Sequence, residues 1–253
     1  MDSVSLNQLV AQLDAWLNPA AIQDYPNAVN GLQLQNSGRV TRVAAAVDAS
    51  RAVIENAVAL GADLLLVHHG LFWTGLRPLT GPDYERIAPA VRGDLAVYSS
   101  HLPLDFHPEL GNNRLFARAM GFDRVEPFLS QRDHAVGLLA SERIAFDDVR
   151  TRASRAVGHE VWYCAAGPAI CERIGIVTGG AGTLLEAAAN AGADTFITGE
   201  GPHHTYALAE DLRVNLIYAG HYATETFGVK ALAVRLQEVF GLPWHFIDRP
   251  SGL

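Results

Sequence analysis

The chain has 253 residues, of which 49% are hydrophobic and 18% are charged, a composition that is typical of a globular protein and excludes a disordered one. Its formal net charge of −8 argues against a general nucleic-acid surface or an anionic-membrane surface. The N-terminus lacks the pattern of a signal peptide, no apolar run is long enough to span a bilayer, and Cys164 and Cys171 match neither a redox pair nor a zinc ribbon. We therefore expect a cytoplasmic protein with two reduced thiols.

The beginning of the chain predicts an α/β pattern. Leucines at helical spacing indicate a helix over residues 5–17, and short apolar runs indicate strands over 32–34 and 43–47. A second helix fits residues 50–60, and Gly61 stands where a glycine commonly ends a helix. Because a further strand follows at once, this order is typical of a parallel βαβ unit.

That further strand is the apolar run 64–67, which leads directly into His68, His69 and Gly70. Neighbouring side chains on a strand point to opposite faces, so the two imidazoles would reach one cavity if they lay just past the strand end, where Gly70 lets the backbone turn. Neutral imidazole is the commonest side-chain metal ligand. We therefore expect a metal site at the carboxyl end of this strand. The alternative is one core histidine beside one surface histidine.

The same pattern occurs twice along the chain. In each half an apolar strand that begins with Arg is followed, 19 residues after that Arg, by Gly-Ala-Asp and another apolar strand. A later strand in each half ends in a histidine, and a carboxylate follows four residues on. The matching segments are 42–47 with 173–177, 61–63 with 192–194, 64–67 with 195–198, and 95–105 with 215–225. Four matches in one order predict an internal duplication, that is, two similar α/β lobes with a metal site in the cleft between them.

The remaining segments complete the two lobes. The pattern predicts strands over 135–140, 161–165 and 244–247, and helices over 146–156 and 224–240. We expect residues 1–125 plus 226–253 to form the first lobe and residues 126–225 to form the second.

Six candidate ligands lie at the ends of these predicted strands, the edge at which ligands bind in open α/β sheets. They are His68, His69, His101, Asp105, His221 and Glu225. If the second-half strand leads into a helix, His221 and Glu225 share a face of its first turn. Pro103 leaves His101 and Asp105 either around a first helical turn or in a loop that folds both inward.

These six groups are too many for one tetrahedral zinc ion with an open position, which needs three protein ligands. They suit two ions that share a bridging carboxylate. Mixed imidazole and carboxylate ligation favours Zn²⁺, Fe²⁺, Mn²⁺ or Co²⁺ over Ca²⁺ or Mg²⁺. Such a pair is expected to hold a bridging hydroxide or water, to attract a small anionic or carbonyl ligand, and to perform hydrolysis.

Weaker candidates lie near the same edge. The repeat aligns Glu200 with His69, so Glu200 is either an acid or proton carrier beside the metals or a solvated loop glutamate. His203 and His204 either face the site or lie on the surface. The aromatic pair at 72–73 either walls the site or packs in the core.

Three motifs together resemble a known family. They are His-His-Gly-x-Phe-Trp at 68–73, His-x-x-x-Asp at 101–105 followed by Leu-Gly-Asn-Asn at 110–113, and Gly-His-x-x-Thr-Glu at 220–225. The chain is similar over nearly its whole length to the short bacterial form of the Nif-three-like dinuclear metal-centre proteins, the GTP cyclohydrolase I type 2 homologues. The resemblance implies a duplicated α/β fold, a homohexamer and two metal ions per chain. It implies His68, His69, Asp105, His221 and a bridging Glu225 as ligands, with His101 near the metals.

Two functions follow from these expectations. The first is a metal-dependent hydrolase of a small anionic or cyclic-amide substrate, with Glu200 as its candidate catalytic residue and a metal-bridged hydroxide as nucleophile. The second is a non-catalytic metal carrier or cofactor-assembly protein. A hydrolase retains its ions through turnover, whereas a carrier exchanges them readily. We expect neither a nucleic-acid partner nor a membrane partner.

Overall fold

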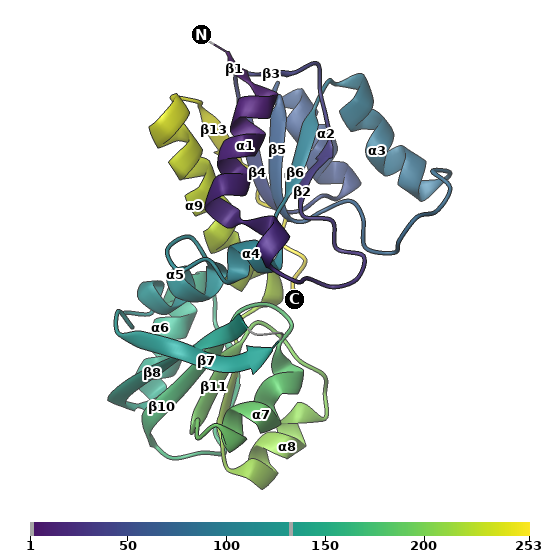
Figure 1. Ribbon diagram of the computed structural model, residues 1–253. Coiled ribbons are helices and arrows are strands. Elements are labelled where there is room, and N and C mark those ends of the chain that lie inside the picture. The colour runs from purple at the N-terminus through teal and green to yellow at the C-terminus, as the bar shows by residue number, and fades with distance from the viewer. Residues whose placement is uncertain (1–2, 132–133) are drawn as a thin grey trace. The chain divides into compact units, whose positions relative to one another are not determined.

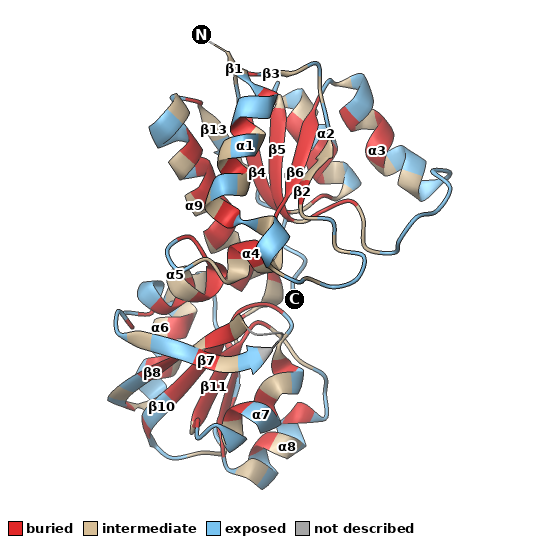
Figure 2. Ribbon diagram, in the orientation of Figure 1, coloured by how far each residue is buried: buried red, intermediate tan, exposed pale blue. Residues whose placement is uncertain are grey.

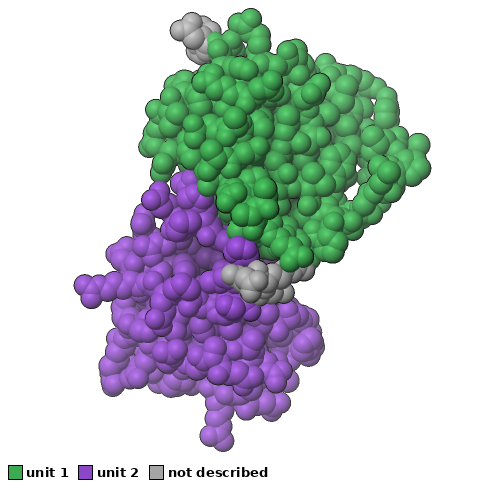
Figure 3. Space-filling model, viewed as in Figure 1, with its two compact units in different colours: residues 1–104, 228–249 green, residues 105–227, 250–253 purple. Residues whose placement is uncertain are grey.

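The computed structural model describes residues 3–131 and 134–253 (Figure 1). The chain forms two compact units, shown in different colours in Figure 3. Unit 1 comprises residues 1–104 and 228–249, and unit 2 comprises residues 105–227 and 250–253. Within the described ranges, no helix combines the length and the hydropathy that crossing a bilayer requires.

Unit 1 is built on a five-stranded mixed sheet with strand order β13-β4-β5-β6-β2. Its strands are β2 (Gly31–Leu34), β4 (Val43–Asp48), β5 (Leu64–His69), β6 (Ala96–Ser99) and β13 (Trp244–Phe246). The strands β13, β4, β5 and β6 run parallel to one another, and the edge strand β2 runs antiparallel to β6. The short strands β1 (Val4–Ser5) and β3 (Arg39–Val40) pair separately.

Helices cover both faces of this sheet (Figure 1). Apolar side chains of α2 (Arg51–Ala59) and α3 (Pro82–Arg92) pack in one core cluster with alternate residues of β4, β5 and β6. α1 (Leu6–Leu17) lies on the other face, where Asp14 accepts a hydrogen bond from the Tyr98 hydroxyl of β6 (2.7 Å). The later part of α9 (His221–Phe240) belongs to the same unit, as do η1 (Pro19–Ala21) and most of α4 (Leu102–Asp105).

Unit 2 is built on a six-stranded mixed sheet with strand order β7-β8-β10-β11-β12-β9. The strands are β7 (Val125–Gln131), β8 (His134–Ala145), β9 (Trp162–Cys164), β10 (Ile170–Val177), β11 (Thr195–Thr198) and β12 (Asn215–Tyr218). α5 (Asn112–Ala119) and α6 (Phe146–Val157) pack on one face. On the other face lie η2 (Gly182–Leu184), α7 (Leu185–Asn190) and α8 (Thr205–Leu212). Figure 2 shows that buried residues concentrate on the strands of each sheet.

The two units share the arrangement that the repeat predicts. Three parallel strands, β4-β5-β6 in unit 1 and β10-β11-β12 in unit 2, are followed in each sheet by one antiparallel strand at the edge. A matching aspartate fixes each crossover. Asp63 Oδ2 accepts from the N–H of Arg42 (3.1 Å), and Asp194 Oδ2 accepts from the N–H of Arg173 (2.9 Å). Both sheets are therefore of the mixed α/β type that was expected, while a common origin of the units stays a prediction.

The structure corrects one expectation about the histidine strand. β5 does not end before His68 but continues through His69, which pairs with Asp48 of β4. Gly70, which follows the strand, has no positive φ. It is needed for space, because a Cβ there would lie 2.6 Å from Ser99 Oγ and would also meet the Gln33 side chain.

Candidate metal centre

Unit 1 brings three imidazoles together at the carboxyl ends of two neighbouring parallel strands. His68 and His69 end β5, and His101 follows the end of β6 by two residues. The ring centroid of His68 lies 4.8 Å from that of His69 and 4.9 Å from that of His101. One nitrogen from each ring lies within 4.8 Å of the others, so a single ion can contact all three. His68 and His69 therefore lie in one cluster although both belong to the strand.

Hydrogen bonds identify the nitrogen that each ring can offer to a metal. His68 Nδ1 lies 2.9 Å from the carbonyl oxygen of Ser100, and because a carbonyl only accepts, Nδ1 carries the proton. His69 Nδ1 donates to Asp48 Oδ1 (2.8 Å), and His101 Nδ1 donates to Asp24 Oδ1 (2.9 Å). Such partners fix the tautomer and the orientation of a ligating imidazole. In all three residues Nε2 is therefore the nitrogen that can bind an ion.

The carboxylate beside His101 is held ionised. Burial raises the pKa of Asp24, but its hydrogen bond to His101, the charge of that ring and the bond from Asn30 outweigh this effect and lower the pKa to about 2. The side chain of Asp24 is only 4% exposed. An ionised, buried carboxylate is a strong acceptor for the His101 N–H.

Aromatic rings border the three histidines. Trp73 meets His101 edge-on, with ring centroids 5.0 Å apart, and lies 5.8 Å from His69. The Trp73 indole donates to the carbonyl oxygen of Gly70 (3.0 Å), which holds the ring in place. Phe72 instead packs against the core cluster of unit 1. Of the aromatic pair at 72–73, the tryptophan therefore walls the site and the phenylalanine serves the core.

Unit 2 contributes a second cluster around the start of α9. His221 is the first residue of this helix, and Glu225 follows one turn later, as the repeat predicts. His221 Nε2 lies 3.1 Å from Glu225 Oε2, and His221 Nδ1 lies 2.7 Å from Glu200 Oε1. Glu225 is 3% exposed. Glu200 therefore lies against the ring of His221.

Two carboxylates change the charge of His221. Burial lowers its pKa, but the hydrogen bonds and negative charges of Glu225 and Glu200 raise it to about 9. In the metal-free protein at neutral pH the ring is therefore an imidazolium that donates to both carboxylates. An ion held at Nε2 would take the place of the proton that faces Glu225, while Nδ1 would keep its bond to Glu200.

Asp105 ends the one-turn helix α4, with Pro103 inside that turn. This settles the choice between helix and loop, because His101 precedes the helix and Asp105 closes it. Asp105 Oδ1 accepts a hydrogen bond from Asn112 Nδ2 (2.8 Å). Of the six predicted ligands, unit 1 holds His68, His69 and His101, and unit 2 holds the other three.

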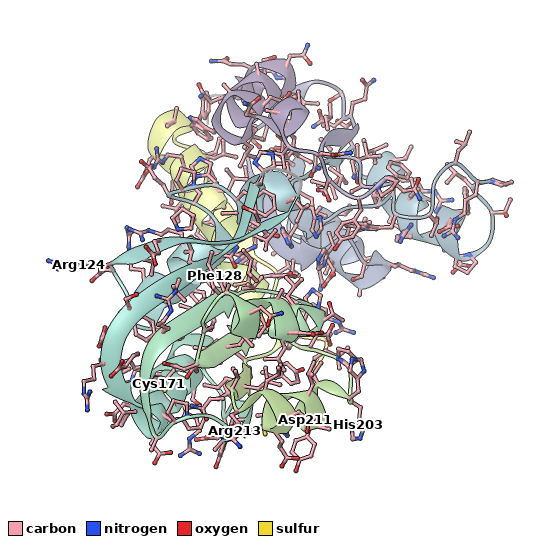
Figure 4. The ribbon with its side chains drawn as sticks, turned by 60° about the horizontal axis from the view of Figure 1, so that its bottom comes forward. Arg124, Phe128, Cys171, His203, Asp211 and Arg213 are labelled. Carbon is pink, nitrogen blue, oxygen red and sulfur yellow. The ribbon has the colours of Figure 1, made fainter. Side chains whose placement is uncertain are left out.

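The clusters suit first-row divalent ions. Imidazole nitrogens and carboxylate oxygens are the donors that Zn²⁺, Fe²⁺, Mn²⁺ and Co²⁺ accept, and a buried carboxylate such as Glu225 needs a positive partner. By contrast, His203 and His204 are exposed at the start of α8, and Figure 4 shows His203 at the surface of unit 2. Of the two alternatives for His203 and His204, the structure shows the second, in which they lie on the surface.

Sequence reasoning missed Asp24 and Asp48. Asp48 ends β4 beside the histidine strand, so a carboxylate at the end of an apolar run was a usable signal. Asp24 lies in a turn-rich segment 77 residues from His101, and nothing in the local pattern indicates this contact.

The family model described as Duf34/NIF3 (NGG1p interacting factor 3) matches residues 4–251. The chain belongs to this family. The resemblance carried by the three motifs is therefore confirmed.

Relatives within the Duf34/NIF3 family match almost end to end. A protein of Deinococcus radiodurans named GTP cyclohydrolase 1 type 2 homolog is 41% identical, with 99% of this chain and 95% of that protein covered. A solved structure titled protein ybgI, unknown function, has a TM-score of 0.91 at 34% identity and covers 99% of this chain and 100% of its own. The structure of TTHA1606 from Thermus thermophilus has the same TM-score at 38% identity, with the same coverage.

Proposed function

We propose that this Duf34/NIF3 protein binds two divalent metal ions and hydrolyses a small anionic or cyclic-amide substrate. His68, His69 and His101 of unit 1 and Asp105, His221 and Glu225 of unit 2 are the proposed ligands of one dinuclear centre, with Glu225 as the bridge. The proposal includes the homohexamer that the family resemblance implies.

One observation carries the proposal. Each of the four histidines donates from Nδ1 to an acceptor, so that Nε2 is the nitrogen that would bind an ion. Three of these acceptors are carboxylates. Histidines that serve only packing do not need this repeated arrangement, whereas metal-binding histidines almost always have it.

Paired divalent ions lower the pKa of bound water and polarise the bond to be cut. Two side chains, Glu200 and Trp73, have properties that suit the proposed hydrolysis. Glu200 accepts from His221 and is 39% exposed, so it can hold His221 in place and exchange a proton with solvent or substrate. Trp73 provides an apolar wall beside His101, which suits a planar substrate group.

The test separates a hydrolase from a metal carrier. Chelator-treated protein is reloaded with Zn²⁺, Mn²⁺, Fe²⁺ or Co²⁺ and screened against phosphoesters, nucleotides and cyclic amides. We expect turnover with at least one class, together with metal that stays bound. His68→Ala should abolish turnover, whereas the control His203→Ala, on the exposed start of α8, should leave it unchanged. Rapid metal exchange with no turnover on any substrate would refute the hydrolase and favour the carrier.

A further inference from the structure

A buried hydrogen-bond network surrounds His101 in unit 1. Asp24 lies between η1 and β2, and its side chain is 4% exposed. Its carboxylate accepts from the N–H of Tyr25 (2.7 Å), the N–H of Leu102 (3.1 Å), Asn30 Nδ2 (2.8 Å) and His101 Nδ1 (2.9 Å). All four partners are donors.

This donor set requires a carboxylate at position 24. Oδ1 accepts from Tyr25 and His101, and Oδ2 accepts from Asn30 and Leu102. An asparagine there would turn its NH₂ group toward at least one of these N–H groups, which places two donors against each other beside a side chain that is only 4% exposed.

Asn30 closes the network. Its Nδ2 donates to Asp24, and its Oδ1 accepts from the backbone N–H of His101 (2.8 Å). The ring of His101 is therefore held through Nδ1 and its backbone through N–H, both by the segment before β2. Because both the backbone and the ring of His101 are held, the direction in which Nε2 points is restricted.

We propose that Asp24 is a positioning residue of the metal centre, which keeps the proton of His101 on Nδ1 and aims Nε2 at the ion. This inference rests on the proposed metal-binding function. Loss of such a partner typically lowers metal affinity about 10- to 100-fold.

Asp48 offers a matched control within the same unit. It makes the corresponding bond to His69 (2.8 Å), but its side chain is 43% exposed. In Asp48→Asn the amide oxygen can still accept from Nδ1, and the NH₂ group can face water. The two substitutions are chemically identical, so they differ only in the surroundings of the carboxylate.

The first measurement is zinc affinity. Chelator-treated wild type, Asp24→Asn and Asp48→Asn are titrated with Zn²⁺ against a chromophoric competitor. We expect Asp24→Asn to bind about 10- to 100-fold more weakly than wild type and Asp48→Asn to lose less than about tenfold. Equal affinity of Asp24→Asn and wild type would overturn this inference alone. Failure of the wild type to bind zinc would overturn the proposed function and this inference with it.

The second measurement reads the tautomer directly and needs no metal, and its wild-type part needs no variant. Long-range ¹H–¹⁵N spectra of metal-free wild type at pH 8 should show His101 with a protonated Nδ1 and a bare Nε2. In Asp24→Asn we expect a mixture of tautomers, which a purely structural role of Asp24 would not produce. A neutral His101 that carries its single proton on Nε2 in the wild type would overturn the proposal.

Discussion

Four histidines of this protein each use Nδ1 to hold an acceptor. The acceptors are the carbonyl oxygen of Ser100 and the carboxylates of Asp48, Asp24 and Glu200. Imidazole has two nitrogens, and a fixed partner on one determines what the other can do. The chemistry of the site therefore depends on the acceptors as much as on the histidines.

The raised pKa of His221 predicts a pH dependence of stability in the absence of metal. Because its pKa rises from 6.5 to about 9 in the folded protein, the bonds of the imidazolium to Glu200 and Glu225 stabilise the fold fully below pH 6.5. This contribution is lost as the pH rises through about 9. We expect the Tm of chelator-treated wild type to exceed that of His221→Gln at pH 6 and the difference to shrink by pH 9.5.

The control for this experiment is His203→Gln, since His203 is exposed and lies outside both clusters. Its Tm should follow that of the wild type at every pH. A difference between wild type and His221→Gln that stays constant or grows from pH 6 to 9.5 would contradict the assignment of charge to His221.

At the scale of single residues, the sequence predicts the candidate ligand histidines and Glu225, because these residues recur at fixed places after apolar strands. It predicts Glu200 only through its alignment with His69, and the structure places it against His221. Asp24 could not be found in this way, because its contact with His101 is set by how a turn-rich segment folds back onto β6. Spacing along the chain carries no information about such a contact.

At the scale of elements, the strand ends determine where the ligands lie. The β4–α2–β5 segment and its counterpart in unit 2 were predicted because buried parallel strands are continuous apolar runs. The predicted end of β5 at residue 67 was wrong, because the pairing of β5 with β4 continues to His69, which lies opposite Asp48. Polar residues at the end of a strand look like a loop in the sequence, although the backbone ladder includes them.

The aspartates of the two crossovers predict matched losses of stability. Asp63 and Asp194 each accept from two backbone N–H groups at the start of the preceding strand. We expect Asp63→Ala and Asp194→Ala each to lower the free energy of unfolding by about 1–3 kcal/mol, because two backbone N–H groups lose a charged acceptor. Urea unfolding measures both changes. The exposed Asp211→Ala on α8 should change stability by less than about 0.5 kcal/mol. A loss in only one of the two crossover variants would contradict their structural equivalence.

A glycine beside α9 predicts a further loss of stability. A Cβ at Gly199 would lie 2.6 Å from the carbonyl oxygen of Gly179 and 2.7 Å from the Cα of His221, and neither backbone can move freely. Gly199→Ala should therefore cost about 1–3 kcal/mol and displace His221. Gly180→Ala is the matched control, since a Cβ there meets nothing closer than 3.4 Å. Equal stability of the two variants in thermal unfolding would contradict the packing described here.

At the scale of the whole chain, the proposed function needs ligands from both units. Unit 1 offers three imidazoles, and unit 2 offers one imidazole and the carboxylates of Asp105 and Glu225. The composition and the two βαβ patterns predicted the mixed α/β class, and the motifs predicted the Duf34/NIF3 family. The helices α3, α5 and α8 were not predicted, because with 11, 8 and 8 residues they are too short to repeat a helical period clearly along the sequence.

Metal content tests the central proposal most directly. Protein purified without chelators is analysed for its elements beside Glu225→Ala, which removes the proposed bridge and leaves the histidines in place. We predict about two divalent ions per chain in the wild type and one or none in the variant, because a bridging ligand serves both ions. A wild type that holds no divalent ion, even after dialysis against Zn²⁺ or Mn²⁺, or a variant that keeps two, would contradict the account.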